Sequence, residues 1–171
     1  MRADTKNQTV IFVCSFNSVR SPIAEGFLRE KGAGKYSVCS AGIAPIRVRP
    51  GAIRVMQEIN IDISGHTPAS LYQYRNQEYD YVVTLCDNVR TTAQEVLQGG
   101  DRFIHRNFVS PQEIGKPPDE TLTDYRRVRD EIGLWIEELF PQPGQDFPKG
   151  TGINSPDRAT TQQHTYGQGL L

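Results

Sequence analysis

The apolar residues of the chain follow two alternating patterns. Short runs rich in β-branched and aromatic residues predict buried strands at 9–13, 36–41, 79–86 and 102–105. Apolar residues at helical spacing predict helices at 22–34, 50–60, 68–74, 89–97 and 121–140. This alternation is typical of an α/β fold, here a doubly wound four-stranded parallel sheet with helices on both faces. Its crossovers should be right-handed, with a functional site at the carboxyl ends of the strands.

Two of the predicted helices should bury a defined face. In the helix that begins at Pro50, the expected buried residues are Ile53, Met56 and Ile59. In the helix 121–140, the apolar stripe comprises Leu122, Tyr125, Val128, Ile132, Trp135, Ile136 and Leu139. Both stripes are expected to pack on the core.

The composition changes after residue 140. Pro, Gly, Gln, Thr and Asn dominate residues 141–171, and the apolar periodicity disappears. We therefore expect one folded domain over residues 1–140, followed by a disordered tail over 141–171. A chain of 171 residues suits one domain with a sizeable core.

The bulk charge and the cysteine content narrow the class of protein. A net charge of −1 argues against a nucleic-acid or membrane-surface partner. No apolar run is long enough to span a bilayer, and the first residues do not resemble a signal peptide. The three cysteines, Cys14, Cys39 and Cys86, match neither a disulfide framework nor a zinc motif. We expect a cytoplasmic protein with reduced thiols at rest and no bound metal.

The segment Cys14–Ser21 carries the clearest chemical signal. It lies between the predicted strand 9–13 and a helix for which Ser21 is the expected N-cap, Pro22 the first residue and Glu25 a first-turn acid. In such a turn, backbone N–H groups and the helix N-terminus bind anions, and an arginine such as Arg20 grips a tetrahedral oxyanion with two hydrogen bonds. The same surroundings favour the thiolate form of Cys14. The alternative is a buried structural Cys14 beside a surface Arg20.

The sequence Cys14-Ser-Phe-Asn-Ser-Val-Arg20-Ser21 resembles the phosphate loop of the cysteine-dependent phosphatases. Its position after the first strand, followed by Pro-Ile-Ala-Glu, is similar to the low-molecular-weight protein tyrosine phosphatase family. The inner residues 17–21 are closer to the arsenate reductases of the same fold. The resemblance covers residues 9–140. It implies that Cys14 is the nucleophile and that the oxyanion is bound by Ser15, Phe16, Asn17, Ser18, Val19 and Arg20.

The resemblance also implies a supporting shell and a second thiol. In the family, residues matching Asn17, Ser21, Ser40 and His66 form a hydrogen-bond network that holds the phosphate loop. Taken alone, His66 is equally well read as an ordinary loop histidine. Cys86 follows Val-Val-Thr-Leu, as does the cysteine of similar arsenate reductases that displaces arsenite and leaves a disulfide. The alternative for Cys86 is a small buried hydrophobic residue, and Cys39 is assigned to the core.

Two departures from the family pattern affect the prediction. Ser110 precedes Pro111, at the position where phosphatases of the family carry the aspartate that protonates the leaving group. A serine hydroxyl does not have a pKa suited to a general acid. Glu113 or Asp119 are the candidate replacements. In addition, residues 87–100 contain no further cysteine to resolve a disulfide. An external thiol, from a thioredoxin or a glutathione–glutaredoxin system, or a rearrangement through Cys39, would then be needed.

These observations support three functions. The leading prediction is an arsenate reductase that uses Cys14, Arg20, Ser21 and Cys86 and requires no bound cofactor. The second is a tyrosine phosphatase that forms a cysteinyl-phosphate at Cys14. The third is a non-catalytic sensor of phosphate groups, because the oxyanion loop is intact and the usual acid is absent.

Overall fold

The computed structural model describes residues 7–97, 100 and 102–141. Its strands are β1 Gln8–Cys14, β2 Tyr36–Gly42, β3 Tyr81–Thr84 and β4 Arg102–His105. They form one parallel sheet in the order β2-β1-β3-β4. The predicted sheet is therefore confirmed, and each observed strand overlaps a predicted one.

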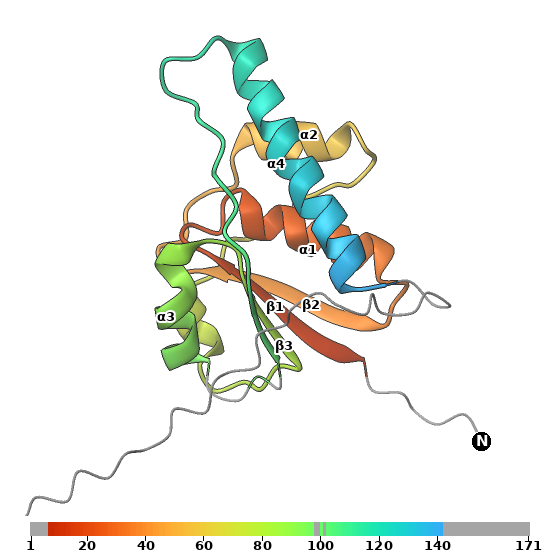
Figure 1. Cartoon of the computed structure of the whole chain (residues 1–171), viewed down its shortest axis with the longest axis vertical. Helices are drawn as coiled ribbons and strands as arrows, with labels where there is room; N and C mark the ends of the chain where they lie inside the picture. Colours follow the sequence, from red (N-terminus) through yellow and green to blue (C-terminus); the bar gives the residue numbers. More distant parts are fainter. Residues whose placement is uncertain (1–6, 98–99, 101, 142–171) are drawn as a thin grey trace, which may run out of the picture.

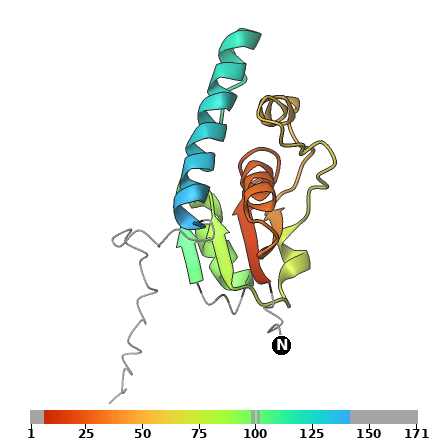
Figure 2. The same cartoon turned by 90° about the vertical axis from the view of Figure 1, so that its right-hand side faces the viewer.

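The helices cover both faces of this sheet (Figures 1 and 2). They are α1 Arg20–Lys31, α2 Pro50–Gln57, the 3₁₀ helix η1 Leu71–Tyr74, α3 Asp87–Val96 and α4 Pro118–Leu139. α1 packs on β1, β2 and α4, and α2 packs on α4, whereas α3 contacts β1, β3 and η1. The N-terminal part of α4 extends beyond the sheet, together with the segment that leads into it (Figure 1).

The strand order places a topological switch point between β1 and β3. α1 connects β1 to β2 on one side, and α3 connects β3 to β4 on the other. Two crossovers that leave neighbouring strands in opposite directions open a crevice at the carboxyl ends of those strands, where α/β proteins bind ligands. Cys14 is the last residue of β1.

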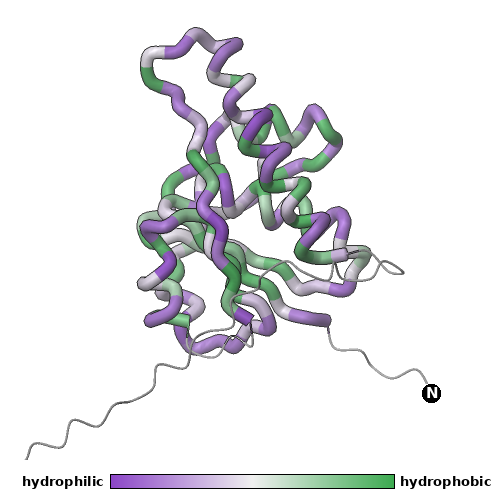
Figure 3. The backbone as a smooth tube through the Cα atoms, viewed as in Figure 1, coloured by the Kyte–Doolittle hydropathy of each residue, from purple (hydrophilic) through white to green (hydrophobic). Residues whose placement is uncertain are grey.

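The central strand and α4 form most of the core. Val10, Ile11, Phe12 and Val13 of β1 are fully buried, as expected for a parallel strand covered on both faces. Figure 3 shows hydrophobic residues concentrated in the sheet, whereas the N-terminal part of α4 is largely hydrophilic. The predicted α4 stripe is confirmed: its fully or partly buried members are Leu122, Tyr125, Val128, Ile132, Trp135, Ile136 and Leu139.

Several details of the helices differ from the prediction; for example, the predicted helix 68–74 is the shorter 3₁₀ helix η1. α1 begins at Arg20 and its N-cap is Val19, without a side-chain cap, because the Ser21 hydroxyl is bound elsewhere. Glu25 consequently lies in the second turn. α2 ends at Gln57, and its buried residues are Ala52, Val55 and Met56. Asn60 then adopts a left-handed φ of 61° that turns the chain, so Ile59 is exposed instead of buried. α4 begins at Pro118, three residues before the predicted start.

Most of the predicted tail, residues 142–171, lies outside the described residues. The expected domain boundary at residue 140 therefore stays a prediction. Among the residues described, no helix is both long and apolar enough to cross a membrane.

Candidate active site

Residues 43–49, here named the strap, follow β2 and hold the loop between β1 and α1. Three strap N–H groups donate to loop carbonyls at about 3 Å: Ala44 to Ser15, Ile46 to Phe16 and Arg49 to Ser18. The C=O and N–H of a trans peptide point in opposite directions, so carbonyls bound by the strap turn N–H groups to the other side of the loop. In the described part of the chain, no acceptor takes a hydrogen bond from the N–H groups of residues 15–19. These N–H groups are free to bind an anion.

Asn17 lies at the centre of the loop and is fully buried. Its φ of 47° is in the left-handed region, which asparagine tolerates better than most residues. Its amide nitrogen donates to the hydroxyls of Ser21 and Ser40, both at 2.8 Å. Its oxygen accepts from the backbone N–H of Ala69 at 2.9 Å and faces a nitrogen of His66 at 3.2 Å. The amide is thus fully bonded, and it joins Asn17 to the other three residues of the expected supporting shell, Ser21, Ser40 and His66.

Glu25 completes this shell, although the sequence indicated no such role for it. The Ser40 hydroxyl donates to the Glu25 carboxylate at 2.6 Å, and His66 Nδ1 lies 3.3 Å from the same oxygen. The other nitrogen of His66 faces Asn17 Oδ1, an acceptor whose identity is set by the Ala69 N–H that it binds. Each ring nitrogen of His66 thus faces an oxygen of the network.

The Glu25 network predicts a dependence of stability on pH. Burial by itself raises the pKa of Glu25, but hydrogen bonds from His66 and Ser40 outweigh burial and lower the pKa below its ordinary value of 4.5. A lowered folded-state pKa stabilises the protein above the unfolded value, and this contribution is lost as the pH falls through the folded value. The difference in unfolding free energy between wild type and Glu25→Gln should therefore be constant above pH ~5 and shrink below it.

Urea unfolding at a series of pH values measures this difference. Glu30→Gln, on the exposed side of the same helix, is the matched control and should show little effect at any pH. A Glu25→Gln difference that stays the same down to pH ~3 would contradict the assignment of Glu25 as the carboxylate of the network.

Cys14 is 2% exposed, and its sulfur lies 3.0 Å from the Ser21 hydroxyl oxygen. That oxygen already accepts a hydrogen bond from Asn17, so the Ser21 hydroxyl proton is directed at the sulfur. A hydrogen bond donated to sulfur stabilises the thiolate form. The loop therefore holds the Cys14 sulfur in an arrangement that suits a nucleophile.

Arg20 is the first residue of α1 and is 9% exposed. Its Nη1 donates to the Phe108 carbonyl at 3.0 Å. A guanidinium has five N–H groups, so this bond leaves the edge formed by Nε and Nη2 for bidentate contact with an oxyanion. The sequence did not indicate a role for Phe108, because every residue has a backbone carbonyl and the residue type does not reveal which one accepts from Arg20.

Cys86 is 2% exposed and lies beyond the strand that was expected to end with it. β3 ends at Thr84, and Cys86 is the N-cap residue of α3. The Leu85 N–H donates to the Val13 carbonyl at 2.9 Å, which keeps the ends of β1 and β3 together. Cys86 Sγ lies 3.3 Å from Ser15 Oγ. Ser15 is the residue that follows Cys14 in the chain. Both cysteines therefore lie at the same edge of the sheet, as predicted.

A polar chain that the sequence did not reveal flanks Cys86. His105, at the end of β4, binds the Thr84 hydroxyl through Nδ1 at 2.7 Å. Its Nε2 lies 2.9 Å from the Asp87 carboxylate. Thr84 and Asp87 stand on either side of the Leu85-Cys86 pair, so His105 helps to fix the position of Cys86.

Comparison with known proteins assigns the family. The model of the low molecular weight phosphotyrosine protein phosphatase family matches residues 9–147. An arsenate reductase of Halalkalibacterium halodurans is 36% identical over 138 residues, which are 81% of this chain and 98% of the relative. The chain belongs to this phosphatase family. A glutaredoxin arsenate reductase of Synechocystis sp. is 35% identical over 131 residues, which cover 77% of this chain and 95% of that relative.

Solved structures of the family have the same fold. An arsenate reductase in a phosphate-binding state is 34% identical and superposes with a TM-score of 0.62, covering 78% of this chain and 96% of that one. A low molecular weight protein tyrosine phosphatase from T. tengcongensis is 25% identical and gives a TM-score of 0.65, with 78% and 97% covered. Both branches named by the resemblance are therefore represented among similar structures.

The two candidate acids of this phosphatase-family chain make no described contact with Cys14. Glu113 accepts from the Tyr125 hydroxyl and pairs with Arg49 at 3.8 Å. Burial first, and then the Glu113 carboxylate, raise the pKa of Tyr125. Asp119 lies in the first turn of α4. In the described contacts neither carboxylate touches the phosphate-type loop, so neither is shown to replace the acid absent at Ser110.

Cys39 belongs to the core side of β2, as expected. It is partly buried and packs against the core cluster. Burial raises the pKa of its thiol to about 11. A thiol with that pKa is almost fully protonated at neutral pH and is a poor nucleophile. This argues against a rearrangement through Cys39.

Over the described ranges, no three His, Cys, Asp or Glu residues are grouped as metal ligands.

Gly42, at the end of β2, is required by the close approach of the loop. A Cβ at this position would lie 2.7 Å from Asn17 N, 2.9 Å from the Phe16 carbonyl carbon and 3.0 Å from Ser15 O. These are backbone atoms, which cannot move aside without distorting the loop. We expect Gly42→Ala to lower the unfolding free energy by about 1–3 kcal/mol and to weaken phosphate binding.

Thermal unfolding and calorimetric titration with phosphate measure the two effects of Gly42→Ala. Gly65→Ala is the matched control, because a Cβ there meets nothing within 4 Å. Unchanged phosphate affinity in Gly42→Ala would show that the loop does not depend on this contact.

Proposed function

We propose that this phosphatase-family protein is an arsenate reductase. The observation that carries the proposal is that Cys86 lies at the same edge of the sheet as Cys14, with its sulfur 3.3 Å from the hydroxyl of Ser15, the residue that follows Cys14. A phosphatase needs only one of these two thiols. The names of the relatives that are 35–39% identical support the same activity.

In the first step arsenate is bound by the free loop N–H groups and the Nε–Nη2 edge of Arg20. The Cys14 thiolate attacks arsenic, and an arsenate oxygen leaves as water after taking up protons. The product is a Cys14–arsenic(V) adduct. The Ser21 hydroxyl lies 3.0 Å from the sulfur and accepts from Asn17, so its own proton is available to the attacking sulfur.

In the second step the Cys86 sulfur attacks the Cys14 sulfur. The S–As bond breaks, its electron pair stays on arsenic, and arsenite leaves. The two thiols have then supplied two electrons and form a Cys14–Cys86 disulfide. The helix α3 begins directly after Cys86, which fixes the position of the attacking sulfur at the end of β3.

Regeneration requires an external thiol. Residues 87–100 contain no cysteine, and Cys39 is held protonated by burial. We propose a glutathione–glutaredoxin donor in preference to thioredoxin, supported by the relative named a glutaredoxin arsenate reductase. Such donors are found in the reducing cytoplasm, where we place the protein.

Arsenite formation from arsenate, assayed with each donor system in turn, tests the proposed function. We expect turnover with glutathione and glutaredoxin and little with thioredoxin. The second candidate, a tyrosine phosphatase, is favoured by the intact Cys14–Arg20 loop alone. Rapid Cys14-dependent hydrolysis of an aryl phosphate, without arsenite formation, would establish it instead.

A further inference from the structure

The segment of residues 108–112, here named the Phe108 segment, links the oxyanion arginine to α4. Its first carbonyl accepts the hydrogen bond from Arg20 at 3.0 Å. The Phe108 N–H donates to the Leu85 carbonyl at 3.0 Å, and the buried Phe108 ring packs edge-on against Trp135 with centroids 5.4 Å apart. The direction of the Arg20 side chain therefore depends on where this segment lies.

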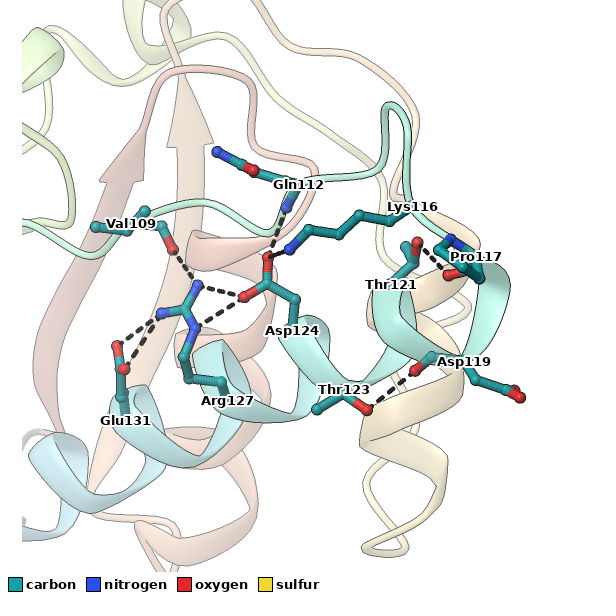
Figure 4. A network of polar contacts seen from close by, with 10 residues as sticks. All are labelled: Val109, Gln112, Lys116, Pro117, Asp119, Thr121, Thr123, Asp124, Arg127 and Glu131. Carbon is teal, nitrogen blue, oxygen red and sulfur yellow. Dashed lines mark hydrogen bonds and ion pairs between the residues drawn. The ribbon is translucent and has the colours of Figure 1, made fainter.

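Two side chains of α4 hold the rest of the segment (Figure 4). One Asp124 oxygen accepts from the Gln112 N–H at 2.8 Å, and Lys116 pairs with the same oxygen at 3.5 Å. The other Asp124 oxygen binds Arg127 at 2.7–2.8 Å. Arg127 in turn donates to the Val109 carbonyl at 3.4 Å. One carboxylate and one guanidinium thus clamp both ends of the segment to α4.

The charge state of Asp124 agrees with this role. The Gln112 N–H, followed by Arg127 and Lys116, lowers the pKa of Asp124 despite the opposing effect of burial. Its side chain is only 14% exposed, so solvent competes weakly for these bonds. The carboxylate is the form that the clamp requires.

We propose that Asp124 and Arg127 are positioning residues of the oxyanion site, which act by fixing the Phe108 carbonyl that aims Arg20. Neither residue touches the anion. The inference rests on the oxyanion site of the proposed function and does not depend on the reduction step. Without the clamp, the Phe108 carbonyl is less well fixed, and Arg20 spends less time with its Nε–Nη2 edge toward the loop.

Calorimetric titration with inorganic phosphate tests the proposal in the full chain. Arg127→Met should weaken phosphate binding about tenfold. This is the size of effect expected when Arg20 loses one charge-assisted hydrogen bond to the anion. Asp124→Asn should weaken it less, since the amide oxygen still accepts from Gln112. Arg126→Met is the matched control. It removes the same charge from the same helix, but Arg126 pairs with Glu58 and makes no contact with the Phe108 segment in the described structure.

A double-mutant cycle separates positioning from a general structural effect. In an Arg20→Lys background, Arg127→Met should have almost no further effect on phosphate affinity. The arsenate KM should rise in Arg127→Met while kcat stays within about twofold. The proposal would be overturned if Arg127→Met lost as much phosphate affinity in the Arg20→Lys background as in the wild type. It would also be overturned if Arg126→Met lost as much affinity as Arg127→Met, or if the unmodified protein did not bind phosphate. Failure to form arsenite, with this binding pattern intact, would refute only the reductase function.

Discussion

Cys86→Ser is expected to reduce arsenite turnover by on the order of 10³-fold or more, whatever reductant is supplied. Serine has nearly the same shape and keeps the hydrogen bond to Ser15, which now lies 3.3 Å from the sulfur. The fold and the phosphate affinity should therefore be unchanged. Without the second sulfur, however, nothing in the chain can take the Cys14 sulfur away from arsenic. Initial rates of arsenite formation under saturating glutaredoxin measure the loss.

Cys39→Ser is the matched control for this experiment. It removes a thiol of high pKa that lies in the middle of β2 and contacts Tyr79 instead of the loop. We expect it to retain turnover close to that of the wild type. Full activity of Cys86→Ser with glutathione would mean that an external thiol attacks the Cys14 adduct directly, and that Cys86 is only a buried residue.

Arg20→Lys is expected to lower kcat/KM for arsenate by about 10²–10³-fold. The guanidinium donates to Phe108 through Nη1 and still offers two parallel N–H groups to the anion. A lysine ammonium carries the same charge but has no planar fork, so it cannot make both contacts at once. Steady-state arsenite kinetics and phosphate titration both report the loss.

Arg126→Lys, a conservative change in the Glu58 ion pair, controls for the effect of exchanging these residue types. It should leave both measurements unchanged. An Arg20→Lys protein that kept wild-type kinetics would show that the free loop N–H groups bind arsenate without bidentate help.

The sheet was predictable because its strands follow local patterns of apolar residues. The placement of Cys14 and Cys86 at one edge of the sheet was predictable because it follows from a general rule of parallel-sheet topology. The apolar runs around Val10–Val13 and Tyr81–Thr84 indicated strands buried on both faces. Parallel strands bring their carboxyl ends together, which was enough to place Cys14 and Cys86 at one edge. The spacing of Cys14, Asn17, Arg20 and Ser21 indicated an anion loop for similar reasons of local geometry.

The parts that escaped prediction depend on long-range contacts. Glu25 looked like a first-turn acid, yet it lies in the second turn and binds His66 and Ser40. Ser21 is a residue type typical of an N-cap and precedes Pro22, but its hydroxyl is hydrogen-bonded to Cys14 and Asn17 instead. A local propensity gave way in each case to a buried polar network, whose members are distant in sequence. Backbone acceptors such as the Phe108 carbonyl cannot be read from residue type at all.

In the proposed reaction, the two thiols of one chain supply both electrons to arsenic. A single-turnover experiment tests it most directly: fully reduced protein is mixed with arsenate in the absence of any external thiol. We expect one arsenite per chain, the loss of two titratable thiols, and a disulfide mapped by mass spectrometry between Cys14 and Cys86. No arsenite, or arsenite formed while the Cys86 thiol remains free, would contradict it.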